Sequence, residues 1–212
     1  MKILLVNGSS HTDGTTMQAL KEMTKVFSEE NAESEIIQIG GGPVADCLQC
    51  HQCLKLEKCV IDGDGVNEFV EKAESADGFV FATPVYFAHP SGRLLSFLDR
   101  AFYSNCGELS YKAFRFKPAA AVTVARRAGT TATLDAVNKY FGIASMPVVS
   151  STYWNMVFDR KAGDARSDEE GMQTMRNLAR EMVWMIKCID AGKKAGIDHP
   201  EPEETAVTNF IR

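Results

Sequence analysis

Short apolar runs with strand-forming residues alternate with longer segments of helical period along most of this chain. The runs lie at Ile3 to Val6, Ser34 to Ile39, Gly78 to Ala82, Ala119 to Val124 and Pro147 to Ser150. The first, third and fourth are almost uninterrupted, as expected of strands that are buried on both faces of a parallel sheet. The helical segments are Thr16 to Ser28, Val66 to Glu74, Ser91 to Tyr103, Thr131 to Phe141 and Glu170 to Ile189. The alternation predicts a doubly wound α/β fold with helices on both faces of the sheet.

The length of the chain limits how these elements are organised. A chain of 212 residues is large enough for one well-buried core and too short for two. The economical topology is a flavodoxin-like, five-stranded parallel sheet in the order 2-1-3-4-5. We therefore predict one domain over residues 1–190, with a cysteine-rich insert at 44–60. The tail at 191–212 has no clear period, and we expect it to cross to a partner subunit.

Charge and hydropathy exclude several classes of partner. The formal net charge is -5, whereas binding to nucleic acids or to anionic membranes depends on clustered Lys and Arg. The N-terminal apolar run at Ile3 to Val6 is too short for the core of a signal peptide, and no later segment approaches the roughly 20 apolar residues of a membrane span. We expect a cytoplasmic protein that binds neither nucleic acid nor membrane.

The loop after the first strand, GSSHTDGTT at residues 8–16, is rich in small hydrogen-bond donors. In an open parallel sheet this loop is the usual phosphate site, because it leads into a helix with free amides and a positive dipole end. The pattern is neither G-x-G-x-x-G nor the Walker sequence. The alternative is a helix start capped by Ser or Thr, with no ligand. The candidate phosphate-binding residues are Ser9, Ser10, His11, Gly14, Thr15 and Thr16.

The loops after the third and fourth strands carry a different kind of surface. In TPVYFAHPSG, Pro84 stiffens the chain, and the side chains that follow can pack on an aromatic ring system. Burial in the core is the alternative for Val85 and Phe87. In ARRAGTT, Gly129 permits close approach of the backbone. The candidate residues of these loops are Pro84, Val85, Tyr86, Phe87, Ala125, Arg126 and Gly129.

Over residues 1–155 the three loops resemble, in order, those of the flavodoxin-like NADPH-dependent FMN reductases and iron-sulfur flavoproteins. That resemblance implies an FMN phosphate on residues 8–16, the isoalloxazine ring against Pro84 to Phe87, and amides or Arg126 near its pyrimidine end. Positive charge there favours the reduced, anionic flavin. This chain has His11 where the family often has Arg or Lys. Because the chemistry belongs to the flavin, we assign no catalytic side chain.

A stretch of four cysteines, CLQCHQCLKLEKC, has the spacing C-x2-C-x2-C-x5-C. Two-residue gaps let thiolates converge on one corner of a metal centre. The stretch resembles the compact motif of the iron-sulfur flavoproteins, which implies a [4Fe-4S] cluster on Cys47, Cys50, Cys53 and Cys59. Zinc, with His51 as a further candidate ligand, and a site without metal are the alternatives. Cys106 and Cys188 stand alone in the sequence and are predicted to be small buried or half-buried thiols.

These features together predict an FMN-dependent oxidoreductase that forms a homodimer or homotetramer. Electrons would come from NAD(P)H, or through the cluster, and pass to a quinone, a second flavin, an azo or nitro compound, or a protein acceptor. Two alternatives are a flavodoxin-type electron carrier that does not use nicotinamide, and a zinc-stabilised structural protein with an empty loop.

Overall fold

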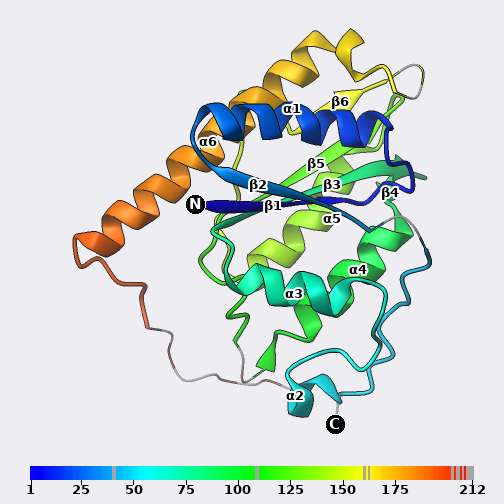
Figure 1. Cartoon of the computed structure of the whole chain (residues 1–212). Coiled ribbons are helices and arrows are strands. Elements are labelled where there is room, and N and C mark those ends of the chain that lie inside the picture. The colour runs from blue at the N-terminus through cyan, green and yellow to red at the C-terminus, as the bar shows by residue number, and fades with distance from the viewer. Residues whose placement is uncertain are drawn as a thin grey trace.

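The computed structural model describes residues 1–39, 42–107, 110–159, 161, 163–201, 203, 206 and 208, and shows a twisted sheet between two layers of helices (Figure 1). The strands are β1 (Lys2–Asn7), β2 (Glu33–Gln38), β3 (Gly78–Tyr86), β4 (His89–Pro90), β5 (Ala119–Ala125) and β6 (Met156–Phe158). The helices are α1 (Thr15–Glu29), α2 (Cys53–Leu56), α3 (Val66–Glu74), α4 (Gly92–Tyr103), α5 (Thr130–Ile143) and α6 (Glu169–Lys194).

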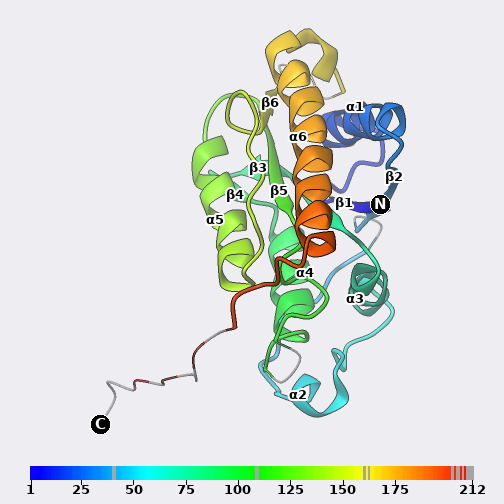
Figure 2. The ribbon, with the colours of Figure 1, turned by 90° about the vertical axis from the view of Figure 1, so that its left-hand side faces the viewer.

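The main series of strands is parallel and runs in the order β2-β1-β3-β5-β6, with the short β4 paired antiparallel to β3 outside this series. Without β4, the order is the predicted 2-1-3-4-5. Helices α1 and α6 cover one face, whereas α3, α4 and α5 cover the other (Figures 1 and 2). The predicted α/β fold is confirmed, with β4 as a sixth strand.

Each strand of the sheet centre contributes to two hydrophobic cores. Alternate residues of a strand point to opposite faces. In β1, Leu4 and Val6 therefore pack with α3, α4 and α5, whereas Ile3 and Leu5 pack with α1 and α6. All four side chains are fully buried. This two-sided burial explains why the run is almost uninterrupted in apolar residues.

The last strand differs from the prediction, because it is split in two. Near Pro147 to Ser150 the chain makes one isolated bridge, Val148 to Ala119, before it leaves the sheet. It returns as β6, which pairs with the other end of β5. Side chains hold the excursion against α6, since the Ser151 hydroxyl donates to the Thr174 carbonyl at 2.8 Å. Pro147 has no N–H to add to the ladder, and the contact of Ser151 with α6 holds the following residues away from the sheet.

The C-terminal part begins with α6, which extends past the predicted end at Ile189 to Lys194. Met172, Met175 and Met182 recur at helical spacing along α6 and are buried in the core that α6 shares with α1. Beyond α6, His199 stacks on Phe116 of the same chain, with ring centroids 3.8 Å apart. Much of 191–212 lies outside the described residues, so its crossing to a partner subunit stays a prediction. Within the part of the chain that is described, no helix has the length and apolar character needed to cross a bilayer.

Candidate functional site: a cleft at the carboxyl edge and a cysteine cavity

A cleft of ≈ 280 Å³ lies where β3, β5 and β6 end, next to the start of α1. This is the edge at which open parallel sheets bind ligands. Its lining residues are Thr15, Pro84, Val85, Tyr86, Val124, Ala125, Arg126 and Asp159. Six of these eight were predicted as cofactor-binding residues from the loop sequences. The cleft therefore brings the phosphate loop and the two apolar loops together, although they are far apart in the chain.

The phosphate loop is held in shape by its own polar groups. Asn7 Oδ1 accepts from the Ser9 amide at 3.1 Å, and Ser9 Oγ accepts from the His11 amide at 3.1 Å. Gln38 Nε2, from the end of β2, donates to the Ser9 carbonyl at 2.7 Å. The N-cap of α1 is Gly14, and no side chain caps the helix. The alternative of a Ser- or Thr-capped helix start is therefore wrong, and the first amides of α1 have no side-chain cap.

The predicted phosphate-binding residues differ in their positions. Ser9, Thr15 and Thr16 are buried, whereas Ser10 and His11 are exposed. The loop is also tightly packed, because a Cβ at Gly8 would lie 2.8 Å from the Ala82 carbonyl oxygen. Buried hydroxyls beside an uncapped helix start are placed to bind an anion, whereas an exposed imidazole at His11 leaves the loop without a buried cation.

Asp159 was not predicted from the sequence and lies in the cleft directly after β6. Its carboxylate accepts from the Thr15 hydroxyl, and from the Gly163 amide at 3.0 Å. Asp159 is 8% exposed, so the carboxylate is a buried acceptor in a site otherwise rich in donors. The one signal for it in the sequence was its place just beyond a strand at the carboxyl edge of the sheet.

The β3–β4 hairpin shapes the apolar wall of the cleft. Phe87 and Ala88 form its two-residue loop, and both have a left-handed φ, at 50° and 63°. This is the pattern of a type I′ turn. It directs Phe87 away from the cleft, and that side chain is 101% exposed. The structure thus brings Pro84, Val85 and Tyr86 to the cleft but does not bring Phe87 there.

Gly129 packs directly against this hairpin. Its φ is +91°, and a Cβ at this position would lie 2.6 Å from Ala88 Cα and 3.0 Å from Val85 Cγ1. The backbone of Gly129 therefore does make a close contact, and its partner is the β3–β4 hairpin, whose residues form the apolar side of the cleft. Arg126, three residues earlier, is exposed and is the one cation among the described lining residues.

Replacing Gly129 by alanine is expected to destabilise the protein by roughly 1 to 3 kcal/mol, because the left-handed backbone and the clash with Ala88 both oppose a Cβ. Urea denaturation of the two proteins measures this difference. Gly142→Ala is the matched control, since nothing lies within 4 Å of its Cβ and it is helical. A Gly129→Ala protein as stable as the Gly142→Ala protein would contradict the assignment.

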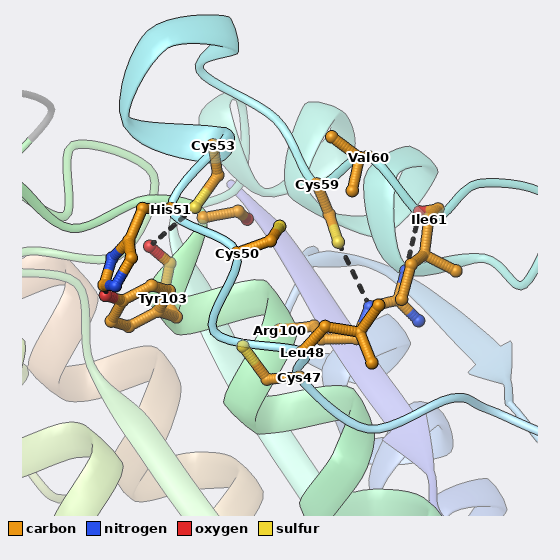
Figure 3. Close-up of a pocket in the computed structure, with 11 residues that line it drawn as sticks. Cys47, Leu48, Cys50, His51, Cys53, Cys59, Val60, Ile61, Arg100 and Tyr103 are labelled. Carbon is orange, nitrogen blue, oxygen red and sulfur yellow. Dashed lines mark hydrogen bonds between the residues drawn. The ribbon is translucent and has the colours of Figure 1, made fainter.

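The four clustered cysteines line a second cavity, between their own loop and the end of α4 (Figure 3). The last turn of α4 and the residue after it complete the wall, through Arg100, Tyr103 and Ser104. Cys53 is buried at the start of α2, Cys47 and Cys59 are half-buried, and Cys50 is exposed. Sequence spacing predicted that all four cysteines lie together, and the fold adds the side chains of α4.

The backbone around Cys50 has an alternating conformation. Gln49 and His51 have left-handed φ values of 50° and 56°. His51 is followed by Gln52 in the right-handed helical conformation. A left-handed residue next to a right-handed one turns successive amides toward one side, as in anion-binding backbone turns.

A fifth thiol, Cys106, lies beside the cavity. Cys106 Sγ donates to the Tyr103 carbonyl oxygen at 3.0 Å, and Cys53 Sγ lies 3.9 Å from the same oxygen. Burial and the neighbouring Cys106 raise the pKa of the Cys53 thiol. Burial also raises the pKa of the Cys106 thiol. Cys106 is half-buried, as predicted, and the turn after α4 brings it close to Cys53. For Cys188 the prediction is wrong, because that thiol is exposed on α6.

The cavity in the present arrangement is small, at ≈ 20 Å³, which is room for about one or two water molecules. Among the residues that the structure describes, no group of three or more His, Cys, Asp or Glu side chains is arranged to hold a metal ion. A zinc ion requires four ligands about one point, whereas a four-iron cluster binds each thiolate to a different iron and so keeps the sulfurs farther apart. Four cysteine thiols are a ligand set used both by zinc sites and by four-iron clusters.

Helix α4 connects the two sites. At its start, Ser91 Oγ donates to the Gly8 carbonyl at 2.8 Å and caps the helix by accepting from the Leu94 amide. At its other end, Arg100 and Tyr103 line the cysteine cavity. Twelve residues of α-helix span about 18 Å, and the described lining residues of the cleft and the cavity do not overlap. The two sites are separate and joined by one rigid element.

Comparison with known proteins identifies the family of this chain. A sequence model of the family described as NADPH-dependent FMN reductase matches residues 1–161. An iron-sulfur flavoprotein of Methanocaldococcus jannaschii is 30% identical over 195 residues, which cover 89% of this chain and 99% of that protein. An iron-sulfur flavoprotein of Methanosarcina thermophila is 27% identical, over 91% of this chain and 99% of its own.

Among solved structures, an archaeal flavodoxin is similar with a TM-score of 0.59 at 11% identity, over 88% of this chain and 99% of that one. This likeness concerns the fold, and it agrees with the strand order described above. The sequence match, the loop order and the sheet topology together show that this chain belongs to the NADPH-dependent FMN reductase family, and it is a flavoprotein oxidoreductase of that family.

Proposed function

We propose that this protein binds FMN in the cleft at the carboxyl edge and moves electrons between NAD(P)H and a second acceptor. The observation that carries the proposal is the meeting of Thr15 at the start of α1 with the apolar segment Pro84 to Tyr86 and with Arg126. The cleft has an end for an anion and an apolar wall for a ring. A flavin mononucleotide has these two parts in the same order.

Each part of the chain has a distinct task toward the cofactor. The buried hydroxyls of Ser9 and Thr16 and the first amides of α1 bind the phosphate. Val85 and Tyr86 pack on the ring, and Arg126 supplies positive charge near it. Asp159, a buried acceptor, receives hydrogen bonds from hydroxyl groups of the cofactor chain. Bound FMN supplies the redox chemistry, and the protein supplies orientation and electrostatics.

The cysteine cavity is proposed to hold a [4Fe-4S] cluster on Cys47, Cys50, Cys53 and Cys59. Four thiols on one cavity, an alternating backbone at residues 49 to 51 and the adjacent buried Arg100 fit a negatively charged iron–sulfur group. The thiols must lose their protons when the metal binds, so cluster assembly is expected to release protons. Such a cluster supplies one-electron transfer beside the FMN site.

The acceptor is a quinone, a second flavin, an azo or nitro compound, or a protein.

We propose that the chain acts as a homodimer or homotetramer, because large apolar side chains are exposed around the cleft. Phe87 is 101% exposed, and Trp154, in the excursion before β6, is 59% exposed. Exposed aromatic groups near one edge are typical of surfaces that meet another chain. Light scattering of the purified protein measures the assembly.

The central test is to identify the cofactor and its reductant. We expect FMN, and not FAD, to copurify, because the loop at 8–16 matches one terminal phosphate and no adenine-binding fingerprint follows it. Mass spectrometry of the released cofactor decides this. Anaerobic addition of NADH or NADPH should then bleach the flavin absorbance. Recovery of FAD, or of no flavin after reconstitution, would refute the assignment of the cleft.

The second candidate is a flavodoxin-type electron carrier, which the strand order also permits. It predicts FMN binding without bleaching by NADH or NADPH, and reduction by a protein or by dithionite alone. The cysteine stretch and the long helix α6 favour the oxidoreductase. Bleaching by a nicotinamide at a rate that supports turnover would exclude the carrier.

A further inference from the structure

The segment that carries Cys59 is built differently from the loop that carries the other three cysteines. Asn67 of α3 binds the Cys59 backbone in both directions, since its Nδ2 donates to the Cys59 carbonyl and its Oδ1 accepts from the Cys59 amide, each at 3.0 Å. The Cys59 side chain is contacted instead by α4, where Arg100 Nε lies 3.2 Å from its sulfur. Two helices thus hold one cysteine, one through its backbone and one through its sulfur.

Arg100 is among the most buried side chains of the protein, at 1% exposure. It donates to the Ile61 carbonyl at 2.6 Å and to the Ala45 carbonyl at 3.3 Å, and it forms an ion pair with Asp64. These partners lie before and after the cysteine loop in the chain. The planar guanidinium therefore ties both ends of residues 45–64 to α4 while one N–H remains on the sulfur (Figure 3).

Burying the Arg100 guanidinium costs desolvation free energy, and better packing alone does not account for its presence in the core. Removing a guanidinium from water is unfavourable, and an apolar residue of similar size often stabilises a core as well or better. An arginine side chain stays charged in proteins. The Nε–H of Arg100 faces the Cys59 sulfur, while Asp64 pairs with another part of the guanidinium.

We propose that Arg100 is a positioning residue of the cysteine site, which holds the Cys59 sulfur in place and raises the reduction potential of the cluster bound there. The inference rests on the proposed cluster and adds two separable effects of one side chain. The fork of N–H groups orders residues 45–64 around the sulfurs. The positive charge beside Cys59 stabilises the form of the cluster that carries one more electron.

The two effects are separated by three variants. Arg100→Met combined with Asp64→Asn removes the positive group beside Cys59 and the fork, at unchanged net charge and without leaving a buried carboxylate unpaired. Arg100→Lys keeps the charge but cannot reach all four partners at once. Asn67→Ala loosens the Cys59 backbone and leaves the charge unchanged, so it is the matched control. All three are made anaerobically as full-length protein with FMN, and cluster content is followed by iron analysis.

All three variants are expected to bind the cluster less tightly. The rate of iron loss to a chelator should rise by about 10- to 100-fold. The reduction potential should separate them. In the double variant, the ratio of reduced to oxidised cluster at a fixed potential should fall at least tenfold, which is about 59 mV for a one-electron couple. In Arg100→Lys and Asn67→Ala, the potential should stay at the wild-type value. Electron paramagnetic resonance during a redox titration measures it.

FMN content and the circular dichroism spectrum show whether each variant is folded, because the cleft does not use these residues. A double variant that binds FMN and keeps the wild-type potential would overturn the electrostatic role. A potential that falls equally in Asn67→Ala would assign the effect to loop order and refute the role of charge. A folded wild-type protein that takes up no iron would refute the cluster itself, and this inference with it.

Discussion

Replacing Cys50 by serine is expected to abolish uptake of a [4Fe-4S] cluster while FMN binding remains as in the wild-type protein. A serine hydroxyl is a poor ligand for iron compared with a thiolate, and Cys50 is the central cysteine of the two-residue spacing. The loss should be nearly complete, so that the iron content falls from four irons per chain to a small fraction of that value. Anaerobic reconstitution with iron and sulfide, followed by iron counting and electron paramagnetic resonance of the reduced protein, provides the measurement.

Cys188→Ser is the matched control, because Cys188 is an exposed thiol on α6, away from the cavity. The oxygen-free preparation matters, since Cys50 is exposed and a cluster at this position would be attacked by oxygen. Equal iron content in the Cys50→Ser and wild-type proteins would show that the cluster assignment is wrong. The flavin site would be unaffected by that result, because its lining residues are different.

The combined change Ser9→Ala and Thr16→Ala is expected to weaken FMN binding strongly while the fold is retained. Both hydroxyls are buried beside the uncapped start of α1. Each hydrogen bond from a neutral donor to a charged phosphate contributes about 1.5 to 3 kcal/mol, so each loss corresponds to about tenfold to a hundredfold in affinity. Flavin titration by fluorescence quenching measures the two dissociation constants.

Ser10→Ala serves as the control for this loop, because Ser10 is exposed whereas Ser9 and Thr16 are buried. Part of the effect of Ser9→Ala arises within the protein, since Ser9 Oγ also accepts from the His11 amide. Riboflavin, which lacks the phosphate, separates the two contributions. If the double variant loses riboflavin and FMN binding by the same factor, the phosphate does not lie on these hydroxyls.

Local sequence determined the elements and most of the loops of this protein. Strands buried on both faces must be apolar at nearly every position, so β1, β3 and β5 were recognisable without any partner. The loops after such strands lie at one edge by the geometry of a parallel sheet, which is why Pro84, Ala125 and Thr15 could be assigned to one cleft. The spacing of Cys47, Cys50 and Cys53 is likewise a local property.

Contacts between distant segments decided the rest. The last strand is split because side chains of its excursion bind α6, and Phe87 points outward because a two-residue turn reverses the chain there. Asp159 reaches Thr15 across the end of the sheet, and Arg100 reaches Cys59 from α4. No spacing or periodicity in the sequence indicates any of these pairs. A hydrogen bond between distant elements depends on how the helices pack on the sheet, and not on neighbours in the chain. The sequence by itself therefore determined the fold class and the loops that form the cleft and the cysteine cavity. The tertiary structure decided which polar groups of other elements contact those loops.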